Sequence, residues 1–275
     1  MPPFQLSLGD LRLTGTSSAG EETWFRLDPP GLALDVGRGA GELVGVRHLF
    51  LSHGHLDHAG GLPWLLSQRK LNRMPVCRVY CPAPILAEVA AFVAAAERLE
   101  RTGYGFELVG LAPGERVLLG RYRLEAFATE HGVPSLGFHL FRGKTRLARE
   151  LAGLDREEIQ ERSRRGEEVT EVVEELALSY CGDTGPGVFA LEPRIFLART
   201  LMLECTFLSP QLRDRAREYG HLHLDDLAGH VAEFENEDLV LFHLSRRHRL
   251  EELREAARNQ LHELKPRLHL VGRAS

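Results

Sequence analysis

The chain has 275 residues, 43% of them hydrophobic, and a formal net charge of −5 at pH 7. This length and apolar content can supply the core of a folded, soluble protein, while the acidic balance argues against one that coats nucleic acid through its overall field. No segment approaches the roughly 18 apolar residues that span a bilayer, and the N-terminus lacks an export pattern, so we expect a cytoplasmic protein with no membrane partner.

Short apolar runs alternate with turns and helical patterns along the whole chain, and no long internal repeat interrupts them. This alternation predicts one interleaved α/β domain over residues 1–275. In the first half, strands are predicted at residues 32–36, 49–51, 76–80, 117–119 and 122–128. Helices are predicted at residues 62–71 and 85–100, the second introduced by Pro82 and Pro84.

The second half repeats this style, except for one charged segment. Strands are predicted at residues 176–181, 201–205, 239–244 and 268–271, and helices at residues 210–218, 224–234 and 250–264. The segment at about residues 142–175 has little apolar periodicity and is predicted to be mostly helical. Because such a segment cannot bury much of itself, we expect an arm that projects from the domain or docks elsewhere.

Residues 52–58, Ser-His-Gly-His-Leu-Asp-His, place three imidazoles and a carboxylate close together. His53 and His55 are two apart, so on an extended segment their side chains project to the same side. Asp57 and His58 need the chain to turn and are easier to aim at a second ion than at the first. Imidazole suits zinc, and carboxylate admits zinc, manganese or iron. The motif predicts a two-metal site, and the alternative is a polar surface loop.

Single His and Asp residues recur at the ends of later predicted strands. His131 follows the run 124–129, Asp183 lies in Tyr-Cys-Gly-Asp-Thr, and His243 ends or interrupts the run 239–244. Alone, each is more often a hydrogen-bonded loop or turn residue. Together with residues 52–58 they complete a set of ligands for two ions.

The remaining histidines and the cysteines carry no such pattern. Four cysteines lie in or beside apolar runs without a Cys-x-x-Cys pair, which predicts reduced core thiols: Cys77, Cys81, Cys181 and Cys205. Six histidines match no ligand position and are expected to be ordinary surface or core residues: His48, His139, His230, His248, His262 and His269.

With these residues in view, the chain resembles the metallo-β-lactamase superfamily and, within it, the tRNase Z family of tRNA 3′-processing endonucleases, most of all the plant-type short form. The resemblance runs nearly end to end, through residues 33–38, 51–63, 131–137, 182–184, 204–207, 220–223 and 243–247. The His-x-His-x-Asp-His segment marks the whole superfamily. Glu204 with Thr206 and Phe207, followed by Gly220 and His221, narrows it to tRNase Z. The chain departs from the family pattern at Leu203, Leu222, His223 and His248.

The resemblance implies a four-layer αββα sandwich that holds two zinc ions per chain, with manganese or iron as other candidates. It implies that His53, His55 and His131 hold one ion, that Asp57, His58 and His243 hold the other, and that Asp183 bridges them. A metal-bridged hydroxide would then attack the phosphodiester, with Asp57 accepting or steering the proton of the water. His221, backed by Glu204, would protonate the leaving ribose oxygen, although a capping or core role for His221 is the alternative.

The resemblance also implies that precursor tRNA is the partner and that the chain forms a homodimer. The segment at residues 142–175 sits where the family carries its flexible arm, so Lys144 and Arg146 are expected to contact the RNA backbone, unless they belong to a solvated charged face. Ser245 and Arg247 lie close enough to His243 to reach a phosphate, with helix capping or a surface ion pair as an equal alternative. Arg69, Lys70 and Arg73 form a second basic cluster.

We therefore predict a metal-dependent endoribonuclease that removes 3′ trailers from precursor tRNA. One alternative is a small-molecule hydrolase of the same fold that acts on a phosphodiester, a cyclic nucleotide or a lactone. Another is a metal-stabilised RNA-binding subunit without turnover, which the complete set of seven ligands disfavours.

Overall fold

The computed structural model describes residues 3–272, in which the strands form two sheets of seven. In each sheet the strands lie side by side in chain order, and antiparallel pairs give way to parallel pairs. The first sheet contains β1 (Phe4–Leu8), β2 (Leu11–Ser18), β3 (Glu22–Asp28), β4 (Leu32–Leu34), β5 (His48–Phe50), β6 (Cys77–Pro82) and β7 (Phe106–Leu111). The second contains β8 (Arg116–Leu119), β9 (Tyr122–Ala128), β10 (Leu136–Leu147), β11 (Thr170–Tyr180), β12 (Thr200–Glu204), β13 (Asp238–Phe242) and β14 (Arg267–Leu270).

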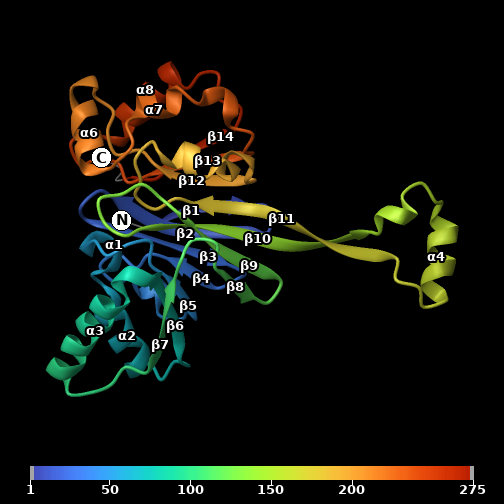
Figure 1. The fold of residues 1–275 in the computed structure, drawn as a ribbon, viewed down its shortest axis with the longest axis horizontal. Coiled ribbons are helices and arrows are strands. Elements are labelled where there is room, and N and C mark those ends of the chain that lie inside the picture. The colour runs from blue at the N-terminus through green and yellow to red at the C-terminus, as the bar shows by residue number, and fades with distance from the viewer. Residues whose placement is uncertain (1–2, 273–275) are drawn as a thin grey trace.

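Helices cover the outer face of each sheet, as Figure 1 shows. The first sheet carries α1 (Leu56–Ala59), α2 (Leu62–Leu71) and α3 (Leu86–Glu100). The second carries α5 (Val188–Leu191), α6 (Arg213–Tyr219), α7 (Leu224–Ala228) and α8 (Leu250–Gln260). One buried cluster lies between the two sheets, and two others lie between a sheet and its helices. The predicted four-layer αββα sandwich is confirmed.

Aromatic side chains from both sheets pack in the central layer. The ring centroid of Phe25 on β3 lies 6.0 Å from that of Tyr180 on β11 and 5.4 Å from that of Phe242 on β13. Such edge-to-face pairs contribute about 0.5–1.5 kcal/mol each beyond the area they bury. This packing fixes the sheets against each other, so the loops that follow β5, β11 and β13 meet at one place.

The predicted strands are confirmed, most of them to within a residue or two at each end. The strand predicted at residues 176–181 begins earlier, at Thr170. The predicted helices also exist, although Gly229 caps α7 well before residue 234. The pattern did not predict β1 to β3, β7 or β10. In β2, for example, the buried side includes small and polar residues such as Gly15 and Ser17 rather than an apolar run.

The arm is mainly a β-hairpin, so the prediction of a mostly helical segment was wrong. β10 and β11 run together out of the sheet, paired from Phe138 with Tyr180 to Leu147 with Thr170. Only α4 (Arg156–Arg164) is a regular α-helix in the arm, and it stands clear of the body at the tip (Figure 1). Ion pairs connect the two strands of the stem: Lys144 pairs with Glu175, and Arg146 pairs with Glu171. The stem therefore does not need the apolar contacts that a packed helix would make.

Two smaller expectations concern single residue types. All four cysteines are buried and free, as predicted. Arg69 is buried and donates to the carbonyl oxygens of Val44, Val46 and Pro75, so it supports a loop and adds no surface charge to the basic cluster.

Within residues 3–272, no helix combines the length and the apolar character needed to cross a bilayer.

Candidate metal and catalytic site

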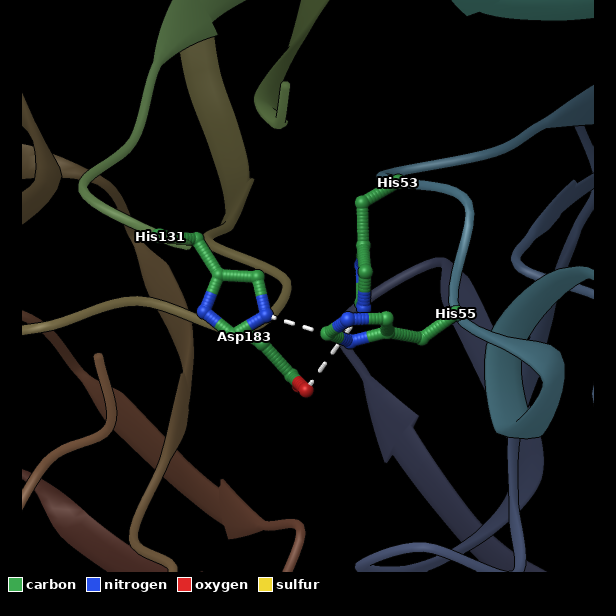
Figure 2. Close-up of side chains that lie close together, drawn as sticks. All are labelled: His53, His55, His131 and Asp183. Atoms are coloured by element: carbon green, nitrogen blue, oxygen red, sulfur yellow. Dashed lines mark hydrogen bonds and ion pairs between the residues drawn. The ribbon is translucent and has the colours of Figure 1, made fainter. Parts of the chain in front are cut away.

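The seven predicted ligands come from both sheets and meet where their loops converge. His53 and His55 follow β5, and Asp57 and His58 lie on α1. The others come from the second sheet, since His131 follows β9, Asp183 follows β11 and His243 follows β13 directly. In Figure 2, His53 and His55 approach from one side, and His131 and Asp183 from the other.

Four of these residues form a first cluster. Ligand atoms of His53, His55, His131 and Asp183 all lie within 4.8 Å of one another. His131 Nε2 is 3.3 Å from His55 Nδ1, and His53 Nε2 is 3.7 Å from Asp183 Oδ2 (Figure 2). Three nitrogens and one carboxylate oxygen at this spacing match the ligand preference of zinc.

Asp57, His58 and His243 form a second cluster under the same limit of 4.8 Å. Asp57 Oδ2 lies 3.5 Å from His243 Nε2 and 3.9 Å from His58 Nε2. Asp183 faces both clusters, because its Oδ1 is 3.3 Å from His58 Nε2 and its Oδ2 is 3.2 Å from His243 Nε2. The arrangement can therefore hold two cations with one shared carboxylate.

Buried polar atoms in this site lack hydrogen-bond partners, which tests whether a metal fits. His53 Nε2, His58 Nε2 and Asp183 Oδ1 are buried atoms of this kind. An unsatisfied buried polar group costs about 1–3 kcal/mol, so such groups are rare unless a ligand completes them. Their convergence fits a bound cation.

Hydrogen bonds at the far side of each ring orient these imidazoles. The Nδ1 of His53 donates to Ser52 Oγ, and that of His58 donates to Asp35. The Nδ1 of His131 donates to the Gly220 carbonyl at 3.0 Å, and that of His243 to Thr206 Oγ1 at 2.9 Å. With Nδ1 occupied as a donor, each Nε2 faces the cluster and is the atom that can bind a metal once it carries no proton.

Asp35 is a functional residue that the sequence reasoning missed. It is fully buried at a φ of 58°, and it accepts hydrogen bonds from the Ser52 backbone at 2.7 Å and from His58 Nδ1 at 2.8 Å. The Tyr180 hydroxyl donates to it at 2.5 Å from the other sheet. The sequence does place an aspartate between an apolar strand and Gly37, which could have marked Asp35 as a candidate. Its hydrogen-bond partners could not be predicted from sequence spacing.

His221 and Glu204 form the predicted pair beside the clusters. His221 Nδ1 donates to Glu204 Oε1 at 2.8 Å. Glu204 is fully buried and also accepts the Thr184 backbone N–H at 2.8 Å and the Thr206 hydroxyl. Burial alone would lower the pKa of His221, but the Glu204 carboxylate outweighs it and raises the pKa to about 9. The ring is therefore protonated at neutral pH, as a proton donor must be.

The carboxylates of the site are charged for a related reason. Burial favours the neutral acid, but the imidazoles of His243 and His58 hold the pKa of Asp183 well below its usual range. The pKa of Asp57 is also low, because a hydrogen bond from His243 and the charge of His58 outweigh its burial. Two neighbouring carboxylates that stay ionised require nearby positive charge.

The four predicted RNA contacts lie in two different places. Ser245 and Arg247 line a cleft of about 300 Å³ that also contains Asp57, Asp183 and His221. Ser245 is buried and its hydroxyl accepts the Arg247 backbone N–H, so it also caps the turn at residues 246–247. Lys144 and Arg146 lie on the arm, where both are about half exposed and paired with glutamates.

His223 does not enter either cluster. Its Nδ1 accepts the Asp225 backbone N–H, and it caps the N-terminus of α7. This agrees with the expectation that it only neighbours the site.

Comparisons with known proteins show which family this chain resembles. Residues 33–244 match the family described as the beta-lactamase superfamily domain. The chain is 31% identical to tRNase Z TRZ1 of Arabidopsis thaliana over 248 residues, which cover 89% of each protein. Among solved structures it resembles the metallo-beta-lactamase fold protein YhfI from Bacillus subtilis, with a TM-score of 0.64 and 15% identity over 96% of this chain and 98% of that one. It also resembles human tRNase Z, short form, with a TM-score of 0.57 and 23% identity over 86% and 93% of the two chains.

The role of Asp35 leads to a prediction about stability and metal affinity. Asp35→Asn replaces the acceptor that orients His58 with an amide that cannot match all its donors. We expect the free energy of unfolding to fall by about 2 kcal/mol and zinc affinity to fall about 10- to 100-fold. Urea unfolding and a chelator competition assay measure the two effects.

Glu107→Gln is the matched control. It alters a surface ion pair with Arg78 in which both side chains are 54% exposed, so a change below about 0.5 kcal/mol is expected. Equal unfolding midpoints for the two variants would show that Asp35 has no special role.

Proposed function

The chain belongs to the beta-lactamase superfamily and, within it, to the tRNase Z family, and from this premise we propose that it is a metal-dependent endoribonuclease that removes 3′ trailers from precursor tRNA. The observation that carries the proposal is the hydrogen bond from His221 to buried Glu204, in the same cleft as the two clusters of candidate metal ligands. Phosphodiester hydrolysis needs both a nucleophile and a proton for the leaving oxygen, and this cleft offers groups for both.

Two zinc ions per chain are the proposed cofactor, although manganese or iron would suit the carboxylates as well. His53, His55 and His131 would hold one ion, and Asp57, His58 and His243 the other, with Asp183 between them. When bound, the ions supply Lewis acidity that activates water and offsets negative charge on the phosphate. The orphaned nitrogens of His53 and His58 support this assignment.

The side chains of this site then divide the remaining work. Asp57 Oδ2 accepts or steers the proton of the attacking water, and the Gly20 backbone N–H holds that oxygen at 2.8 Å. His221 donates its Nε2 proton to the leaving 3′ oxygen, while Glu204 stabilises the charged ring. Ser245 and Arg247 bind a neighbouring phosphate at the edge of the cleft. The products are a tRNA that ends in a 3′-hydroxyl and a trailer that begins with a 5′-phosphate.

The arm is proposed to grip tRNA away from the cleft through backbone contacts, including those of Lys144 and Arg146. Both cations already have glutamate partners, so RNA would have to compete with Glu175 and Glu171. We also propose that the chain is a single domain that works as a homodimer in the cytoplasm, where its four buried free thiols would stay reduced.

The direct test is cleavage of a trailer-bearing precursor tRNA by the zinc-loaded protein. The wild type is expected to release the intact trailer, and Asp57→Ala is expected to lose at least about a hundredfold in rate, because it removes both a ligand and the proton acceptor. Product lengths and end groups are read on sequencing gels. Absence of cleavage, or equal rates for both proteins, would refute the proposed function.

The raised pKa of His221 predicts a pH dependence. The ring loses its proton as the pH rises through about 9, so kcat/KM is expected to fall above this pH. Glu204→Gln removes the charge that raises the pKa and should move this descending limb to lower pH. By linkage, the stability from the pair is fully present below pH 6.5 and is lost as the pH rises through about 9.

Initial rates across the pH range, with folding checked by circular dichroism, measure the effect. If the descending limb lies at the same pH in Glu204→Gln as in the wild type, His221 is not the proton donor.

Deleting the arm distinguishes an RNA-processing enzyme from a small-molecule hydrolase. Replacement of residues 144–174 with a short Gly-Ser turn should lower affinity for precursor tRNA at least about tenfold, since each lost phosphate contact weakens binding. Hydrolysis of a small aryl phosphodiester reports whether the site is still intact. Unchanged tRNA binding by the shortened protein would contradict the proposed role of the arm.

A further inference from the structure

Tyr219 is a half-exposed aromatic residue in the reaction cleft. It is the last residue of α6 and precedes Gly220, whose φ of 66° turns the chain toward His221. Its side chain is 50% exposed and lines the same cleft as Asp57, Asp183 and His221. An exposed ring beside reactive groups has a free apolar surface for a ligand.

Arg215 lies one turn earlier on α6 and packs on this ring. Its guanidinium carbon is 5.0 Å from the ring centroid of Tyr219, and both side chains line the cleft. Residues four apart share one face of a helix, so the two side chains present a joint surface. Aromatic rings and guanidinium planes are the surfaces on which proteins stack unpaired nucleobases.

The charges in the cleft point to the same class of ligand. Three arginines line it, and Arg246 donates to Glu21 at 2.7 Å. Over residues 3–272, neither Arg215 nor Arg247 forms an ion pair with a carboxylate. In a chain with a net charge of −5, cations left free beside the reacting groups suit a phosphodiester backbone.

The position of His221 indicates on which side of the scissile phosphate the leaving nucleoside lies. Its ring centroid lies 5.2 Å from those of His131 and His243, and Gly220 connects it to the end of α6. A proton donor must come within hydrogen-bond reach of the leaving oxygen. The nucleoside that carries this oxygen therefore lies on the α6 side of the scissile phosphate.

We propose that Tyr219 and Arg215 form a stacking site for the base on the leaving-group side of the scissile phosphate, which is the last base of the tRNA product. This inference rests on the proposed function and adds to it a site that holds the end of the tRNA. Tyr219 and Arg215 are positioning residues: they fix the nucleoside so that its 3′ oxygen lies at His221.

Three precursor tRNAs test this site: an unmodified one, one that lacks the last tRNA base, and one that lacks the first trailer base. For the wild type, loss of the last tRNA base should raise KM about tenfold, since one stacked base is lost. Tyr219→Ala and Arg215→Gln should raise KM by a similar factor on the unmodified substrate, but no further on the substrate that already lacks this base. Tyr219→Phe keeps the ring and should restore the wild-type KM.

Arg217→Gln is the matched control, because Arg217 is exposed on another face of the same helix. Its KM should equal that of the wild type. Equal KM for Tyr219→Ala and the wild type on the unmodified RNA would overturn the site. If Tyr219→Ala raises KM on the substrate that lacks the last tRNA base, but not on the one that lacks the first trailer base, then the ring stacks on the trailer and the proposed side is wrong.

A binding measurement separates this inference from the proposed function. The zinc-loaded protein binds a precursor whose scissile phosphate is an uncleavable phosphonate and whose last tRNA base is 2-aminopurine. Stacking should quench its fluorescence in the wild type, and Tyr219→Ala should lose the quench and bind about tenfold more weakly. Quenching without cleavage of normal precursor would keep the stacking site and refute the proposed activity, whereas equal binding by both proteins refutes the stacking site.

Discussion

The buried carboxylate of Asp35 is the contact on which the rest of the site depends. It accepts hydrogen bonds from the backbone and the hydroxyl of Ser52, from His58, and from Tyr180 on the opposite sheet. Through Ser52 it also orients His53. A left-handed backbone costs a non-glycine residue about 1 kcal/mol, so Asp35 keeps its φ of 58° because four donors require it there. Loss of this one acceptor would loosen both sheets and two of the metal-binding imidazoles.

Glu204, at the end of a strand of the second sheet, is a buried acceptor in the same way as Asp35. The hydrogen-bond partner at Nδ1 determines the protonation state of each histidine, and thereby its chemistry. His53 has only the Ser52 hydroxyl there, and burial lowers its pKa well below the usual range, so it is neutral and ready to bind a cation. His221 has Glu204 there, and its pKa rises to about 9. Burial opposes the charge on His58 as well, but Asp183 and Asp35 raise its pKa, so His58 must release a proton when a metal binds. One residue type is thus prepared for two proposed roles in one cleft, that of a ligand and that of a proton donor.

Much of this arrangement could be predicted from the sequence, where a feature was local. Residues 52–58 and the His or Asp after each later strand predicted the side chains that the structure brings together in the two clusters, and apolar runs predicted most strands. Contacts between distant residues were out of reach: Asp35 meets Tyr180 across 145 positions, and His131 is held by the Gly220 carbonyl. The hairpin of the arm was missed because its stem is stabilised by cross-strand ion pairs, which leave no apolar alternation in the sequence. The Arg215 and Tyr219 pair was missed because its meaning depends on the cleft it lines.

Electrostatics finally link the metal site to RNA binding. A phosphodiester that enters the cleft approaches Asp57 and Asp183, both ionised at neutral pH because their pKa values are lowered. Arg215, Arg247 and protonated His221 line the same cleft and supply positive charge, but over residues 3–272 neither arginine pairs with these carboxylates. Cations held by the seven ligands would turn this repulsion into attraction. We therefore expect the two binding events to be coupled, so that metal occupancy raises affinity for precursor tRNA and bound RNA raises affinity for the metal by the same factor.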